Sequence, residues 1–172
     1  MGELYKRVLV KPGNTLKVCC AAMENSLSSA PPTVVIDTQI VMEWLVFKDA
    51  KAAPLVRALE VGAIRWIGSP AMLGELRHVL GRGIAAKFSP DLPSIEQAFA
   101  RHCEAIDTPP LPAVRLICRD PDDQMFIDLA IAEQARWLIS RDRDVLALAK
   151  RARASGVLIL TPEAWIKQLP VS

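Results

Sequence analysis

Four acidic residues follow or adjoin apolar segments that are typical of buried strands, and this placement is the first sign of chemistry in the chain. They are Asp37, Glu75, Asp123 and Asp142. Because the carboxyl ends of parallel strands meet at one edge of a sheet, folding can gather these carboxylates there. Such a cluster repels itself unless a cation fills it, and oxygen ligands of this kind suit Mg²⁺ or Mn²⁺. The pattern therefore indicates metal-assisted phosphate chemistry.

Two of these acids come directly after apolar runs. Asp37 follows residues 34–36, and Asp142 repeats the arrangement after residues 137–140. Capping of the next helix is the alternative role for an Asp at such a position, but two strand-end acids favour a shared site. The hydroxyls of Thr38 and Ser140 could hold these carboxylates in one orientation by hydrogen bonding.

The loop before the next apolar helix carries three acids around Pro121, namely Asp120, Asp122 and Asp123. Ordinary solvated loop residues are the alternative here. Asp123 is the best candidate for an inward carboxylate because it immediately precedes the apolar helix. Glu75 lies at the edge of the apolar arc of its own helix, where most glutamates are solvated but a cleft is within reach.

Other kinds of site have little support. The two histidines, His78 and His102, do not follow expected strands, which argues against a histidine triad or a zinc site. The four cysteines form no C-x-x-C pair, and no glycine-rich phosphate loop follows the first strand. Arg119 and Arg141 adjoin the proposed ligands and are the candidates for contacts to phosphate groups.

The order of apolar segments predicts alternating strands and helices. Strands are expected at 34–36, 64–67, 137–139 and 157–160, and helices over the segments around 40–45, 52–59, 70–80, 94–105, 123–132 and 145–149 and after Thr161. Near-continuous apolar strands of this kind form a parallel sheet that is covered on both faces. We therefore expect an α/β fold.

Length and composition support one such domain. With 172 residues, 51% of them hydrophobic, and a net charge of +2, the chain forms a single core, and its charge alone does not identify a nucleic-acid binder. Residues 1–32 form an N-terminal extension and residues 33–172 the domain. The apolar run 18–23 is too short for a signal peptide, no stretch would cross a membrane, and the cysteine usage favours the cytoplasm.

Five motifs together resemble PIN-domain proteins, in particular the toxins of bacterial toxin–antitoxin systems. They are Val34-Val-Ile-Asp-Thr38, Glu75-Leu-Arg-His-Val-Leu80, Arg119-Asp-Pro-Asp-Asp-Gln-Met-Phe126, Leu138-Ile-Ser-Arg-Asp142 and Ile159-Leu-Thr-Pro162. The resemblance covers about residues 33–168 and implies a three-layer α/β/α sandwich with a central parallel sheet. It also implies a metal-dependent ribonuclease with Asp37, Glu75, Asp123 and Asp142 at the family's acidic positions.

The resemblance carries further expectations about the site. Asp120 is an additional metal-ligand candidate beside Asp37, Asp123 and Asp142. Gln39 stands where the family commonly has Asn, so its contact to the metal or to Asp37 is altered, and Ser140 stands where Thr is common. One or two ions, Mg²⁺ or Mn²⁺, would bind the scissile phosphate and activate water.

The expected partners are RNA, a cognate antitoxin and, as a further option, a second copy of the chain in a homodimer. Two other functions remain open at this stage. One is a non-catalytic RNA- or protein-binding module with the same fold. The other is a receiver-like phospho-acceptor domain, although the lysine expected near its last strand is missing, because Leu160 leads directly to Thr161-Pro162.

Overall fold

The computed structural model describes residues 30–83 and 85–168 of the chain. Of the N-terminal extension predicted for residues 1–32, residues 1–29 lie outside the described part. The chain divides after Ala30. The description below concerns the second unit, Pro31–Ser172, alone.

The centre of this unit is a parallel sheet of five strands. They are β1 (Thr33–Ile36), β2 (Arg65–Gly68), β3 (Cys103–Ala105), β4 (Trp137–Ile139) and β5 (Leu158–Leu160), in the order β3-β2-β1-β4-β5. Every neighbouring pair is parallel. The chain builds outward from β1 to one edge and then returns to the other side of β1. The carboxyl ends of β1 and β4 therefore flank the switch point at which such sheets bind ligands.

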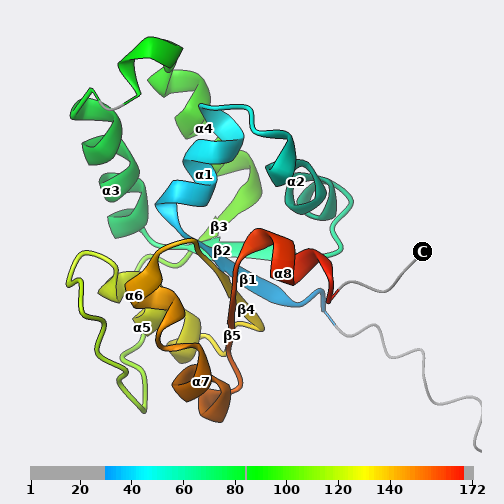
Figure 1. Cartoon of the computed structure of the whole chain (residues 1–172), viewed down its shortest axis with the longest axis vertical. Helices are drawn as coiled ribbons and strands as arrows, with labels where there is room; N and C mark the ends of the chain where they lie inside the picture. Colours follow the sequence, from blue (N-terminus) through cyan, green and yellow to red (C-terminus); the bar gives the residue numbers. More distant parts are fainter. Residues whose placement is uncertain (1–29, 84, 169–172) are drawn as a thin grey trace, which may run out of the picture. The chain divides into compact units, whose positions relative to one another are not determined.

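Helices cover both faces of the sheet (Figure 1). The helices are α1 (Thr38–Leu45), α2 (Ala53–Glu60), α3 (Pro70–Gly81), α4 (Leu92–His102), α5 (Gln124–Ala132), α6 (Arg143–Leu146), α7 (Ala149–Ala152) and α8 (Pro162–Ile166). Short 3₁₀ turns occupy Ala50–Ala52, Ala86–Phe88 and Arg153–Ser155. The expected α/β class and its three layers are confirmed.

The two-residue period of β1 divides the core into two clusters. Val34 and Ile36 pack with buried residues of α1, α2, α3, α4 and α8, whereas Val35 packs on the other face with residues of α5, α6 and α7. Since side chains of a strand alternate between the faces of a sheet, a fully apolar strand is what a doubly covered sheet requires. This burial fixes the carboxyl end of β1, and with it the position of Asp37.

Two expectations about local structure need correction. The helix expected over 94–105 ends at His102, and β3 follows at once, where Glu104 and Ala105 are exposed. Pairing with β2 forms this short edge strand, although its sequence carries no apolar run. The single helix expected around 145–149 is two short helices, α6 and α7. The domain boundary at residue 33 stays a prediction.

No helix within residues 30–83 and 85–168 combines the length and apolarity needed to cross a membrane.

Candidate active site

The structure brings the four predicted acidic residues to one pocket of about 300 Å³. Asp37 follows β1, Asp142 follows β4, Asp123 precedes α5 and Glu75 lies on α3. The pocket thus opens at the switch point of the sheet. Its remaining wall is formed mainly by Thr38, Gln39, Met42, Phe47, Val79 and Phe126.

Asp37 is held from two sides. Its Oδ1 accepts a hydrogen bond from the Gln39 backbone N–H at 3.1 Å and caps α1, while its Oδ2 accepts one from the Ser140 hydroxyl at 2.5 Å. The residue is only 5% exposed. Helix capping and a place in the pocket, which were alternatives in the sequence, are therefore combined in one side chain.

Asp142 has a similar double role. Its Oδ1 accepts hydrogen bonds from the Asp144 N–H at 2.7 Å and the Val145 N–H at 3.2 Å, and so caps α6. Its own backbone N–H donates to the Ser140 Oγ at 2.9 Å. The fully buried Ser140 hydroxyl consequently links the backbone of Asp142 to the carboxylate of Asp37.

Two carboxyl groups in the pocket, those of Asp123 and Asp37, have a raised pKa. Burial raises the pKa of Asp123 to about 7, with further contributions from the negative charges of Asp37, Asp142 and the neighbouring loop acids. Burial also raises the pKa of Asp37, although the hydrogen bonds from Ser140 and Gln39 oppose this and the charges of Asp142 and Glu75 add to it. The negative charges of the carboxylates in the pocket repel one another, so a cation bound there would reduce this repulsion.

The chemistry of the donor set fits a hard divalent cation, because all four side chains offer carboxylate oxygens. Within the described ranges, however, no three His, Cys, Asp or Glu side chains are close enough together to form a complete metal site. Mg²⁺ is usually bound through one or two carboxylates and completes its shell with water and substrate phosphate. One or two of Asp37, Asp123 and Asp142 would hold it directly.

Other predicted site residues have different surroundings. Asp120 is exposed outside the pocket wall, and its Oδ1 accepts from the Asp122 N–H at 3.0 Å within the turn. Thr38 and Gln39 line the pocket, but the hydrogen bond that Gln39 gives Asp37 comes from its backbone and its side chain is exposed. Asp120 therefore acts on Asp123 only through its charge in this conformation.

Arg141 has a different environment from the one expected of an RNA contact. Its Nε donates to Glu43 Oε1 at 2.7 Å, and its Nη1 and Nη2 donate to the two oxygens of Glu163 at 2.9 and 2.7 Å. The hydrogen bonds from Arg141 lower the pKa of Glu163 to about 2. Arg141 therefore joins the turn after β4 to α1 and α8, whereas Arg119 is exposed.

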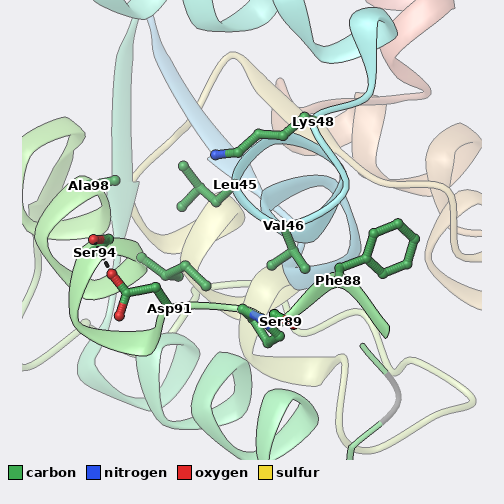
Figure 2. Close-up of a pocket in the computed structure, with 10 residues that line it drawn as sticks. Leu45, Val46, Lys48, Phe88, Ser89, Asp91, Ser94 and Ala98 are labelled. Carbon is green, nitrogen blue, oxygen red and sulfur yellow. Dashed lines mark hydrogen bonds between the residues drawn. The ribbon is translucent and has the colours of Figure 1, made fainter. Parts of the chain in front are cut away.

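A second pocket, of about 260 Å³, lies apart from the carboxylates between the end of α1 and the start of α4 (Figure 2). Its wall includes the apolar Leu45, Val46 and Phe88, and its one carboxylate, Asp91, accepts a hydrogen bond from Ser94. The acidic cluster is absent from this wall, so the pocket has none of the chemistry that the switch point offers.

Fold and pocket together define a doubly wound α/β domain with a carboxylate-lined pocket at its switch point. The chain belongs to the PIN domain family, whose sequence model matches residues 33–144. PIN domains are in general nucleases that depend on a divalent metal ion.

The comparison with solved structures finds a similar chain in the crystal structure of VapBC2 from Rickettsia felis bound to a DNA fragment from their promoter. The TM-score is 0.50 at 15% sequence identity, over 74% of this chain and 96% of that chain. At this identity the likeness concerns the fold. No curated protein sequence matches the chain.

Proposed function

We propose that the protein is a metal-dependent endoribonuclease and the toxin of a toxin–antitoxin pair. The observation that carries this proposal is the convergence of Asp37, Glu75, Asp123 and Asp142 on one pocket at the switch point of a PIN domain. A carboxylate pocket with no histidine or thiol in its wall suits phosphodiester hydrolysis by water and not by a protein nucleophile.

In the proposed reaction, the metal ion and the carboxylates of the pocket have different roles. A bound Mg²⁺ or Mn²⁺ would lower the pKa of a water molecule and stabilise charge on the scissile phosphate. The Asp37 carboxylate is fixed by the Gln39 N–H and the Ser140 hydroxyl, and Asp142 Oδ1 is fixed by the Asp144 and Val145 N–H groups, so both side chains need little reordering on binding. With its pKa raised to about 7, the Asp123 carboxyl is partly protonated at neutral pH in the metal-free pocket, and a cation would displace that proton.

The antitoxin partner is part of the same proposal. The structure with the similar fold is that of VapBC2 bound to promoter DNA, and the sequence motifs resemble toxins of such pairs. We propose a cognate antitoxin and a cytoplasmic location for this chain on that basis. Assembly into a homodimer stays a prediction.

The test is cleavage of a panel of cellular RNAs, including transfer RNAs, with Mn²⁺ and with an excess of chelator. We expect chelator-sensitive cleavage of single-stranded or looped RNA and weak activity on duplex DNA. Asp123→Asn should suppress the single-turnover rate by more than tenfold, while Asp122→Asn, which removes the same charge from an exposed neighbour, should change it less than threefold.

The loop variants also test the assignment of ligands. Equal losses at Asp122 and Asp123 would mean that the loop acts through its total charge. A larger loss in Asp120→Asn would move the ligand to that position. RNA that stays intact with Mn²⁺ at high protein concentration would refute the nuclease.

A non-catalytic binding module is the second candidate, since no three carboxylates form a complete metal site within the described residues and the side chain of Gln39 is exposed. Binding of RNA without cleavage, unchanged by chelator, would establish it. The receiver-like alternative is set aside because the chain belongs to the PIN family.

A further inference from the structure

The connection between β3 and α5 carries three large apolar side chains on its surface. Leu111 is 91% exposed, Val114 56% and Ile117 61%. Toward its end the connection alternates, because Leu116 and Cys118 are each 5% exposed and the residues between and beside them face solvent. Alternating burial is the pattern of an extended segment with one face on the protein.

The outward face of this segment consists of Arg115, Ile117 and Arg119, which we call the Arg-Ile-Arg strip. The Arg115 side chain is 59% exposed, and its ion pair with Asp128 is long at 3.3 Å. Because the Arg115 end of this pair is exposed, although the Asp128 side chain is only 22% exposed, the guanidinium group can exchange Asp128 for a phosphate. Two guanidinium groups with an apolar side chain between them are therefore available to a ligand.

One half-buried side chain, that of Gln124, fixes the strip to the domain. The Gln124 Oε1 accepts from the Cys118 backbone N–H at 2.8 Å, and its Nε2 donates to the Leu116 carbonyl at 2.8 Å. The same Nε2 donates to Asp128 Oδ1 at 2.8 Å. Gln124 thus makes the backbone hydrogen bonds that a neighbouring strand would otherwise make to this segment. These bonds keep Leu116 and Cys118 turned toward the domain and the strip turned toward solvent.

The strip leads directly to the carboxylate pocket. Arg119 is four residues before Asp123, which lines the pocket. A chain that crosses the strip therefore arrives at the proposed metal ligands.

We propose that the Arg-Ile-Arg strip is the surface along which single-stranded RNA lies as it enters the carboxylate pocket, and that Gln124 is its positioning residue. This inference rests on the proposed ribonuclease function. The two arginines contact phosphates, and Ile117 contacts the face of an unpaired base. Arg115 and Arg119 are four residues apart with Ile117 between them, which suits contacts to a short stretch of a single strand.

Charge and shape favour a single strand over other occupants. The positively charged strip adjoins the acidic pocket. The phosphates of a polyanion can pair with the arginines of the strip, while a cation bound to the polyanion pairs with the carboxylates of the pocket. In duplex RNA the bases are stacked inside and their faces do not reach Ile117. One narrow segment is also too small for a stable protein interface, which needs about 800 Å² from each partner.

The strip is tested by single-turnover cleavage of a labelled single-stranded RNA at several protein concentrations, and by equilibrium binding of the same RNA without metal. Arg115→Gln with Arg119→Gln should raise the half-saturating concentration at least tenfold and leave the maximal rate within threefold. Because two phosphate contacts are lost, the slope of log Kd against log salt should fall by about 1.4. Ile117→Ser should weaken binding about fivefold or more and leave that slope unchanged.

The matched control is Arg151→Gln with Arg153→Gln, which removes two exposed positive charges on and beside α7. It should leave both binding and its salt dependence unchanged. Gln124→Ala should weaken binding without lowering the maximal rate, whereas Gln97→Ala, at an exposed site on α4, should do neither. Thermal unfolding of each variant verifies that the domain stays folded.

The outcomes separate this inference from the proposed function. If the wild type cleaves RNA and the strip variants keep its half-saturating concentration and salt slope, the strip is overturned while the ribonuclease stands. If the wild type binds RNA without cutting it, the binding assay still decides about the strip. A change confined to self-association or to binding of a protein would make the strip a protein interface and overturn the inference.

Discussion

Replacement of Asp123 by Asn should stabilise the metal-free protein at high pH and have little effect at low pH. The folded-state pKa of this carboxyl is about 7, above its ordinary 3.8. The folded protein therefore binds this proton more tightly than the unfolded chain. The associated stability is fully present below about pH 4 and is lost as the pH rises to about 7. Asn cannot ionise, so the variant escapes this loss.

The size of the effect follows from the pKa. At full strength the rise would correspond to about 4 kcal/mol. Asp123 is only half-buried, and water and salt screen its charge, so we expect about 1 to 2 kcal/mol at about pH 8. Burial is the main cause of the raised pKa, followed by the neighbouring carboxylates. Because salt screens the contribution of the neighbouring carboxylates, a lower salt concentration should enlarge the gain in stability.

The assay is urea unfolding with chelator present, at about pH 4 and about pH 8, for the wild type, Asp123→Asn and Asp122→Asn. Asp122 is exposed in the same loop and loses the same charge. The difference between the two variants should be near zero at the lower pH and about 1 to 2 kcal/mol at the higher one. Equal gains at both positions, or a gain that is the same at both pH values, would refute a raised pKa at Asp123.

Three further predictions concern stability. Ser140→Ala should cost about 2 to 3 kcal/mol, because it removes the donor to Asp37 from a fully buried site, and an unfolding midpoint unchanged from the wild type would contradict this. Gly68→Ala would place a Cβ 2.6 Å from the Cys103 Sγ and should lower the free energy of unfolding by about 1 to 3 kcal/mol. Adding Cys103→Ala should recover most of this loss. If the effects of the two substitutions simply add in the double mutant, the clash is not the cause. Gln134→Gly should stabilise the end of α5 by about 0.5 to 1 kcal/mol, since Gln134 has a positive φ of 50°, and thermal unfolding that shows a decrease would disprove strain there.

Local patterns predict most of the fold because its strands are buried on both faces. Val34, Val35 and Ile36 are each nearly inaccessible, and an uninterrupted apolar run records that burial directly. The edge strand β3 has no apolar run, since Glu104 faces solvent. The pairing of β3 with β2 depends on the tertiary structure and not on a local sequence pattern. The sequence therefore predicts the four apolar strands, including the edge strand β5, better than the short edge strand β3.

The same contrast holds for the candidate site. Strand-end acids could be placed together from topology, because strand ends define one edge of the sheet. The partners of Arg141 could not, as Glu43 precedes it by 98 residues and no short-range pattern relates the two. The role of Gln124 was also missed, because its contacts are to backbone groups whose side chains carry no signal.

The position of β4 in the sheet has a consequence for the order in which the protein is made. The Ser140 hydroxyl that holds Asp37 comes from a residue 103 positions later, and β4 must pair with β1 before the two meet. During synthesis the earlier acidic residues leave the ribosome well before this partner does. A nascent or truncated chain that ends before β4 thus lacks Asp142 and the anchor of Asp37. The pocket is completed only when the domain is nearly finished, so incomplete copies of the chain should lack the proposed nuclease activity.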